Sequence, residues 1–441
     1  MILILIFLLP LALLPQCVFA QSPSTSDTSI PSVSVGSVNS TSSSPLSTTS
    51  SESAGGIPVE TPTSGRQNVT ATTSTTSLDV TAIVGLSPST DTTDGSASTT
   101  SAAHPRPTNT RPCNGYVEFC QRKISNISMV VAHNSPFVRL HNAASNQAYP
   151  VLNQLNDGIR GLQFETQKPN ASSSIRLCHT SCDLLDMGTL ESYLATVKTW
   201  LDKNPYEVIA IMMGNNNGLS TRIPATDYIA PFHASGIQNY LWTPPSPTLN
   251  LPDWPTLSHL ILTNKRVITM LDYGAHPPTV PWLLPEFNYQ WQTPFSPTDP
   301  AFPCTQHRPP NQPDPVSRNR MYMLNHNLNI QLRILPGQAP ILLPAYSLLD
   351  QVNAVAGNGS LGRSVKECEA LWGRPPNWIL VDYYNCGSFN GSVFEVAARA
   401  NRVPFWDRAC CGSGLVSGAR GWVLRGWLWA VSGMVVGWLL V

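Results

Sequence analysis

The stretch "SMVVAHNS", residues 128–135, decides the fold class that this chain is expected to have. Its apolar run from Met129 to Ala132 is short and unbroken, which is typical of a strand buried on both faces in a parallel sheet covered by helices. The run ends on His133 and Asn134. Because functional residues of such sheets lie where the strands end, we predict that these two side chains belong to a site.

Apolar, β-branched runs alternate with helical patterns over residues 113–407, a length that suits one large barrel or two small domains. We predict helices at 190–204 and 392–401. Such alternation predicts parallel strands joined by right-handed crossovers. We therefore expect an α/β fold, a (β/α)8 barrel of the TIM type whose strands need not be regular. The predicted strands are 128–133, 160–166, 174–179, 207–213, 266–272, 320–326 and 377–384, with a proline-rich excursion over 274–318.

Side-chain alternation brings two histidines into this site. His133 shares a face of the first predicted strand with Val131, and His179 shares a face of the third with Leu177. If both faces look into the barrel, the two rings meet at its top. Imidazoles with pKa values near 6.5 hold opposite protonation states near neutral pH, so one accepts a proton while the other donates one. The competing interpretation is that each is an ordinary core or surface histidine.

Two further strands add polar residues to the same end. Gln163 and Glu165 share a face of the second strand, and the alternate residues are apolar and should pack against helices. Asp382 lies on the last strand, which in a barrel closes beside the first, so we expect its carboxylate to orient His133. If the substrate of this site carries a phosphate group, the residues that we predict to contact the phosphate or the rest of the substrate are Asn134, Gln163, Asn215 and Tyr384.

Five motifs in order resemble the X-region of phosphatidylinositol-specific phospholipases C, and in particular the GPI-anchored, phospholipase-C-like phosphodiesterases of fungi. The resemblance covers essentially all of residues 113–407. It implies a TIM-type barrel with phosphodiesterase activity. The motifs are "AHNS" (132–135), "GIRGLQFET" (158–166), "LCHTSC" (177–182), "NPYEVIAIMM" (204–213) and "NWILVDYYN" (377–385).

The resemblance also assigns roles to single residues. It implies that His133 is the general base on the inositol 2-hydroxyl and that His179 is the general acid to the diacylglycerol leaving group. Asp382 matches the carboxylate that holds the base histidine. Asn134 and Glu165 are similar to residues of the calcium-dependent members, which makes them candidate ligands of Ca²⁺.

This chain departs from the calcium-dependent pattern at two further ligand positions, where it offers Gln163 and Met213 instead of acidic residues. A hard cation prefers several oxygen ligands, charged ones above all. Calcium therefore stays a candidate cofactor, and the sequence requires none. The negative charge of a bound phosphate is left without an evident counter-charge.

The two ends of the chain differ from its middle. Residues 1–20 are apolar and end in Val-Phe-Ala, as a secretory signal peptide does, although a retained signal anchor has the same look. Residues 21–112 are expected to be a disordered, O-glycosylated stalk, because 43 of the residues from 21 to 110 are Ser or Thr and eight are charged. Residues 408–441 resemble a GPI attachment signal with an apolar tail of 16 residues, and a transmembrane helix is the alternative.

The cysteine content and the net charge of the chain limit the kinds of compartment and partner that we expect for it. The ten cysteines of an exported chain are first read as disulfides, and Cys113 with Cys120 and Cys178 with Cys182 are near enough to close small loops. The formal net charge is zero, which gives a nucleic-acid partner no electrostatic support. N-glycosylation sequons are a further feature that is typical of a cell-surface glycoprotein.

The leading hypothesis is thus an extracellular phosphodiesterase anchored to the outer face of the plasma membrane or cell wall, acting on a phospholipid or an inositol phosphodiester. A second hypothesis is a cell-surface glycoprotein with a catalytically weak or inactive barrel that serves in binding or wall structure. A third, a glycerophosphodiesterase-like barrel, needs a richer carboxylate–metal centre than the sequence displays.

Overall fold

Eight parallel strands form one curved sheet around β1, Met129–Ala132. On its two sides β1 pairs with β2, Gly161–Glu165, and with β12, Trp378–Val381. The strand order is β7-β6-β5-β2-β1-β12-β9-β8, and every pairing is parallel. The other strands are β5 (Ile209–Gly214), β6 (Val267–Leu271), β7 (Leu283–Pro285), β8 (Gln290–Gln292) and β9 (Met321–Asn325).

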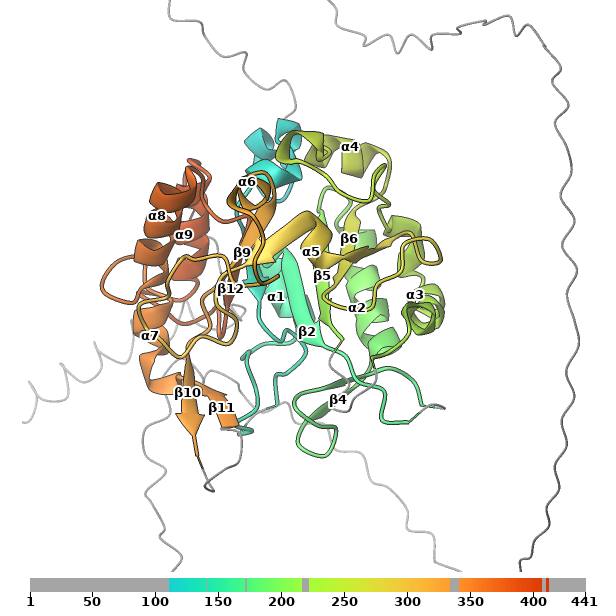
Figure 1. Cartoon of the computed structure of the whole chain (residues 1–441), viewed down its shortest axis with the longest axis horizontal. Coiled ribbons are helices and arrows are strands. Elements are labelled where there is room, and N and C mark those ends of the chain that lie inside the picture. The colour runs from blue at the N-terminus through green and yellow to red at the C-terminus, as the bar shows by residue number, and fades with distance from the viewer. Residues whose placement is uncertain are drawn as a thin grey trace, which may run out of the picture. The chain divides into compact units, whose positions relative to one another are not determined.

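This sheet confirms the predicted TIM-type barrel in an irregular form (Figure 1). The sheet order ends at β7 and β8, which do not pair with each other, so the curled sheet is not closed by hydrogen bonds at that place. Both edge strands have only three residues and lie in the proline-rich excursion, where no strand was predicted. Their shortness explains the omission, because three residues show no measurable alternation.

The described residues of the computed structural model are 111–139, 141–170, 173–215, 222–333, 341–406 and 410–411. The predicted signal peptide, nearly all of the predicted stalk and the chain beyond Cys411 lie outside these ranges. Contacts divide the chain into two compact units, and the smaller one, Pro23–Pro105, is wholly outside the description. Within the described ranges no helix is both long enough and apolar enough to cross a bilayer.

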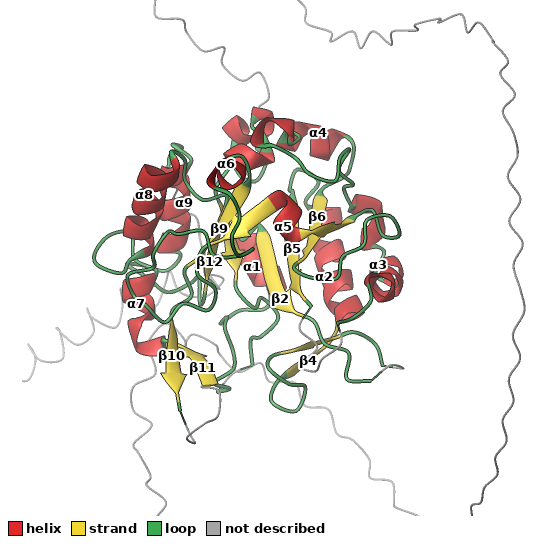
Figure 2. Ribbon diagram, in the orientation of Figure 1, coloured by secondary structure: helices red, strands yellow, loops and turns green. Residues whose placement is uncertain are grey.

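Alternation along the strands separates two apolar cores. Val131, Met212 and Leu380 belong to the core inside the barrel, whereas their neighbours Val130 and Ile211 pack outward in the larger core beneath the helices. Figure 2 shows these helices around the sheet. Because both faces are buried, the strands read as continuous apolar runs.

Both predicted helices are confirmed, with α2 at Leu190–Lys203 and α9 at Ser392–Ala400. The side chain of Thr189 accepts a hydrogen bond from the backbone N–H of Ser192 and so caps the start of α2. The other helices are α1 (Val151–Asp157), α3 (Ile229–Ala234), α4 (Leu257–Leu262), α5 (Glu286–Tyr289), α6 (Asp314–Arg318), α7 (Leu349–Val352) and α8 (Leu361–Trp372).

The prediction of a barrel strand at 174–179 is wrong. Residues Arg176–Cys178 form β3, which pairs antiparallel with β4, Asp186–Thr189, in a separate two-stranded sheet. A second such pair consists of β10, Asn329–Leu332, and β11, Ile341–Pro344. The apolar run before His179 is a signal of burial, and burial alone does not say which sheet a strand joins.

Disulfides fasten the loops that surround the barrel. The two local pairs considered from spacing, Cys113–Cys120 and Cys178–Cys182, are both present. The structure adds Cys304–Cys368 and Cys410–Cys411, and no cysteine of the described residues is free.

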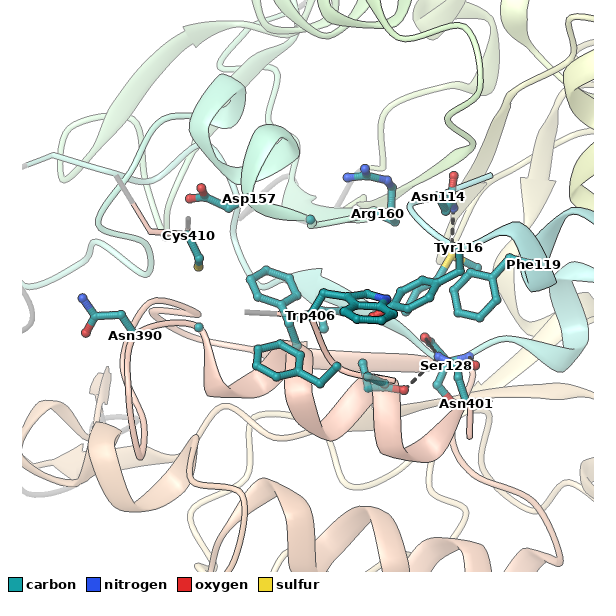
Figure 3. A pocket seen from close by; sticks show the side chains of 18 residues that line it. Asn114, Tyr116, Phe119, Ser128, Asp157, Arg160, Asn390, Asn401, Trp406 and Cys410 are labelled. Carbon is teal, nitrogen blue, oxygen red and sulfur yellow. Dashed lines mark hydrogen bonds between the residues drawn. The ribbon is translucent and has the colours of Figure 1, made fainter. Parts of the chain in front are cut away.

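A groove lies at the amino-terminal ends of the strands, away from the predicted site (Figure 3). Tyr116, Phe119 and Trp406 line it together with Ser128 and Met129 at the start of β1. Its walls include five aromatic side chains and contain neither of the predicted catalytic histidines. His133 lies at the opposite, carboxyl-terminal end of β1.

Candidate active site

His133 and Asp382 stand next to each other because β1 and β12 are neighbours in register. Ala132 pairs with Val381, so the residues that follow them emerge side by side. The Nδ1–H of His133 donates a hydrogen bond of 2.7 Å to Oδ1 of Asp382. This contact fixes the tautomer and leaves Nε2 of His133 with its lone pair, as a general base requires.

Three amide side chains that the sequence did not single out hold this pair. Asn146 donates through Nδ2 to Oδ1 of Asp382 at 3.0 Å, and Gln147 donates to the carbonyl of His133 at 2.8 Å. On the other side, Nδ2 of Asn327 lies 3.5 Å from Nε2 of His133. Asn146 and Gln147 come from the loop after β1. Their amide side chains, in a loop that is buried, were the only feature of the sequence that could have indicated a role for them.

His179 reaches the site by another route than the one predicted. It follows β3 rather than a barrel strand, in a loop closed by the Cys178–Cys182 disulfide, with its backbone N–H bonded to the carbonyl of Leu185. Its ring lies 5.0 Å from the ring of Phe137. Burial, and after it the charge of His133, lower the pKa of His179 to about 4.

A small central pocket of about 20 Å³ opens inside the barrel, and neither His133 nor His179 lines it. Gln163 lines it and accepts a hydrogen bond of 3.1 Å from the backbone N–H of Asn134, which connects the pocket to the loop after His133. The remaining polar residues that line it are Glu165, Asp272, Glu286, Gln292, Arg308 and Asn325.

Arg308 is the cation of the central pocket. Its Nη2 lies 3.2 Å from Oδ2 of Asp272, and its guanidinium carbon lies 4.4 Å from the centre of the Phe295 ring. Gln292 and Glu286 continue the network, since Gln292 donates to Oε1 of Glu286. No pattern in the proline-rich excursion points to Arg308, so sequence reasoning had no way to find the counter-charge.

Burial raises the pKa of three carboxyl groups in this pocket. For Glu165 the pKa is about 7, first because the group is buried and then because Asp272 lies near. The pKa values of Asp272 and Glu286 are also raised, chiefly by burial. A single guanidinium among three carboxyl groups leaves at least one of them prone to hold a proton at neutral pH.

One known protein family matches most of this chain. The sequence profile of the PI-PLC X domain matches residues 119–396. The chain belongs to this family. This confirms the predicted resemblance to the X-region of phosphatidylinositol-specific phospholipases C.

Two proteins of Arthroderma benhamiae are similar to this PI-PLC X domain protein. One, named an uncharacterized secreted protein, is 49% identical over 341 residues, which are 77% of this chain and 73% of that one. The other, named PI-PLC X domain-containing protein 1, is 42% identical over 278 residues, 62% of this chain and 86% of that one.

Solved structures of the phosphatidylinositol-specific phospholipase C from Staphylococcus aureus are more distant. Two of them are 13% and 15% identical to this chain, with TM-scores of 0.36 and 0.41. Each alignment covers 65% of this chain and 95% of the bacterial one.

The four predicted substrate contacts of this PI-PLC X domain fall into two groups. Asn134 and Gln163 lie at the site, and Oδ1 of Asn134 is buried without a hydrogen-bond partner. Asn215 has both ends of its amide engaged, accepting from the backbone of Ile223 and donating to the carbonyls of Ile223 and Tyr273. These bonds give Asn215 a role in holding its loop, and the structure offers no support for a substrate contact there.

Tyr384 lies away from the site. Its hydroxyl donates to Oδ2 of Asp157 at 2.5 Å, and its ring packs in the outer core. The expected alternation stops at the end of β12, because Tyr383 has a φ of 44°, which turns the chain. Parity counted from Asp382 therefore does not extend to Tyr384.

Glu165, on β2, and Asn134, two residues after β1, are the candidate calcium ligands. Oε2 of Glu165 and Oδ1 of Asn134 are buried without partners, as ligand atoms would be. However, Gly214 rather than an acidic residue stands beside Glu165, and Met213 packs in the outer core. Among the described residues, Glu165 does not belong to any group of three Asp, Glu, His or Cys side chains whose ligand atoms lie within 4.8 Å of one another. We derive no step through calcium.

Glu165→Gln is expected to stabilise the folded chain at pH 8 and to leave its stability nearly unchanged at pH 4. The folded state keeps a proton up to a pKa of about 7, whereas the unfolded chain releases it near 4.5. The free energy of unfolding therefore falls as the pH rises from 4.5 through 7, and glutamine removes this loss of about 3 kcal/mol. Urea unfolding at both pH values, with a chelator present, measures the difference.

The matched control for this variant is Glu367→Gln, whose side chain is exposed and whose effect should stay within about 0.5 kcal/mol. A Glu165→Gln protein that is less stable than the wild type at pH 8 would contradict the proposed protonation. If calcium stabilised the wild type but not the variant, our conclusion about the metal would be wrong.

Proposed function

We propose that this PI-PLC X domain protein is a phosphodiesterase that cleaves an inositol phospholipid through the neighbouring 2-hydroxyl of the inositol ring. The observation that carries the proposal is the pair formed by His133 and Asp382, with Nε2 of His133 left as an acceptor at the barrel mouth. Membership of the PI-PLC X domain family supports the same chemistry.

The proposed step balances its atoms without a cofactor. Nε2 of His133 takes the proton of the inositol 2-hydroxyl, whose oxygen forms a new bond to phosphorus. The bond from phosphorus to the glycerol oxygen breaks, and His179 gives that oxygen a proton. The products are diacylglycerol and a cyclic inositol phosphodiester, and the proton has moved from His133 to His179 after exchange with water.

His179 needs the substrate in order to act as an acid. With a pKa of about 4 in the ligand-free chain, its ring is neutral at pH 7. The phosphodiester is an anion, and an anion beside an imidazolium raises its pKa. We therefore propose that substrate binding charges His179, and that Arg308 supplies the positive charge that no residue predicted from the sequence provides.

The test is to follow phosphatidylinositol in detergent micelles by phosphorus NMR with the purified protein. We expect a cyclic phosphodiester as the first product, formed with or without a chelator. Absence of any product at any pH from 5 to 8 would overturn the proposal. A non-cyclic monoester that appears first would point to direct attack by water instead.

A second candidate function is favoured by the neutral, buried His179 in the ligand-free chain. In this second function the protein is a cell-surface glycoprotein whose barrel is catalytically inactive. Binding of cell-wall carbohydrate that survives His133→Ala, together with no turnover by the wild type, would support it.

We also propose that the chain is exported and attached to the outer cell surface, by cleavage after residue 20 and GPI attachment near Ser413. The secreted relative supports export. Amino-terminal sequencing and release of the protein by a GPI-cleaving enzyme test the two ends separately.

A further inference from the structure

A further pocket lies at the amino-terminal end of the sheet, where β1 and β12 begin. Its volume is about 350 Å³, against about 20 Å³ for the central pocket. We call it the basal pocket. Ser128 and Asn401, which Figure 3 labels, line both this pocket and the groove described above. The lining of the basal pocket consists of residues 125–128, 373–375 and 400–402, together with Arg122, Glu369 and Asn377.

The basal pocket is separate from the candidate active site. Ser128 in its wall and His133 in the active site stand at opposite ends of β1. Five residue steps of about 3.3 Å each put them roughly 16 Å apart along the strand. Neither His133 nor Arg308 lines the basal pocket. A ligand bound there would therefore leave the catalytic groups uncovered.

Positive charge dominates the lining of the basal pocket. Its described charged side chains are three arginines, Arg122, Arg374 and Arg402, and one carboxylate, that of Glu369. Oε1 of Glu369 lies 3.3 Å from Nη2 of Arg402, so these two groups neutralise each other. The charges of Arg122 and Arg374 are left without a counter-charge in the lining.

Arg122 and Arg374 are held by neutral acceptors. Nη1 of Arg122 donates to the carbonyl of Asn401 at 2.8 Å, and Nη1 of Arg374 donates to Oδ1 of Asn377 at 2.9 Å. Nη2 of Arg374 donates to the carbonyl of Arg320, and its Nε is buried without a hydrogen-bond partner. Within the described part of the chain, neither guanidinium forms an ion pair with a carboxylate.

The surroundings make both charges costly. Burial lowers the pKa of Arg374 to about 10 and also lowers the pKa of Arg122. Glu118, which does not line the pocket, raises the pKa of Arg122 again, and the charge of Arg402 opposes this. Both guanidinium groups are nevertheless charged at neutral pH. An anion in the basal pocket would stabilise both charges at once, which is the source of the affinity that we expect.

We propose that the basal pocket binds a phosphate monoester. A monoester carries a charge of about −1.5 to −2 at pH 7, which matches the two uncompensated arginines, whereas a diester carries a single negative charge. Phosphate oxygens also accept the parallel hydrogen bonds that a guanidinium donates. The volume leaves room for a small organic group on the phosphate. The inference is independent of the proposed function, in which a diester is cleaved at the other end of the sheet.

The experiment titrates the secreted full-length protein at pH 8 by isothermal calorimetry, with glycerol 2-phosphate as the monoester and dimethyl phosphate as the diester. We expect the monoester to bind about tenfold or more tightly than the diester. Arg122→Met should weaken monoester binding about tenfold or more, because a charge-assisted contact is lost. Arg363→Met is the matched control, since this arginine pairs with Glu367 outside the pocket, and it should bind as the wild type does.

Glu369→Gln should change the affinity in the opposite direction. It removes the one carboxylate among the described lining residues and frees Arg402, so the monoester should bind about threefold more tightly. A folding defect does not produce tighter binding. This variant therefore keeps the proposal testable if Arg122→Met proves unstable.

Two further measurements locate the site and the source of the ligand. Arg122→Met should keep the wild-type kcat on phosphatidylinositol while it loses monoester affinity, and the calorimetric results hold whether or not the protein turns over any lipid. Vesicles that contain phosphatidic acid present a phosphate monoester as a lipid headgroup. Vesicle binding that Arg122→Met abolishes would identify a lipid ligand, whereas binding of glycerol 2-phosphate without vesicle binding would identify a soluble one.

Three results would overturn the site. The first is equal monoester affinity for the wild type and Arg122→Met, which would place the binding elsewhere. The second is the absence of monoester binding by the wild type at millimolar concentration. The third is monoester binding by Asn126→Gln alone, because Asn126 lines the pocket and begins an N-glycosylation sequon, so a glycan would then be the natural occupant.

Discussion

His133→Ala is expected to lower kcat on phosphatidylinositol by about 10³-fold while the chain keeps its fold, because positioned general bases contribute about 10²- to 10⁴-fold. The side chain is 12% exposed and its only ionic partner among the described residues is Asp382, so its loss removes the acceptor for the 2-hydroxyl proton and little packing. Initial rates of product release, measured beside circular dichroism, give both quantities.

The control for this variant is His276→Ala, which removes an exposed histidine that bonds only to Thr279 in its own turn. It should retain wild-type kcat. Asp382→Asn adds a test of orientation, since the amide can present an N–H instead of an acceptor to Nδ1 of His133 and so disfavour the active tautomer. Equal turnover by the wild type and His133→Ala would remove the basis of the mechanism.

Arg308→Met is expected to lower kcat by about 10²- to 10³-fold, the usual cost of losing one group that stabilises developing charge. It should also reduce the free energy of unfolding by about 3–5 kcal/mol at pH 8. The reason is that Asp272 keeps its buried carboxylate without the guanidinium 3.2 Å away, close to Glu165 and Glu286. Urea unfolding and steady-state kinetics measure the two effects.

Arg308→Lys separates charge from geometry. It retains the positive charge but not the planar fork, so we expect a loss intermediate between wild type and Arg308→Met. The surface control Arg363→Met breaks an exposed pair with Glu367 and should cost at most about 0.5 kcal/mol. An Arg308→Met protein with full activity would show that another group meets the phosphate charge.

The barrel was predictable because it depends on local patterns. Buried strands such as β1 and β5 carry unbroken apolar runs, and amphipathic spacing marks α2. The edge strands β7 and β8 were missed because three residues carry no period. β3 was misplaced because its apolar residues show that it is buried without showing against what.

The site was predictable where it depends on the order of the strands. His133 and Asp382 follow the first and last strands of a barrel, and these strands must be neighbours when the sheet curls. Asp272 is the last residue of the predicted strand 266–272 and has the inward parity, so attention to strand ends would have found it. No local pattern in the sequence indicates that Glu286 or Arg308 belongs to the site.

The sequence by itself determined the parallel sheet, the neighbouring histidine and carboxylate, and the family, because each follows from a repeat along the chain or from motifs in order. Only the tertiary structure decided that His179 arrives from a disulfide-closed loop, that Arg308 enters the pocket, and that Tyr384 turns away. These placements depend on contacts between residues far apart in the chain. Burial then sets the charge of the groups it collects, raising the pKa of Glu165 and lowering that of His179.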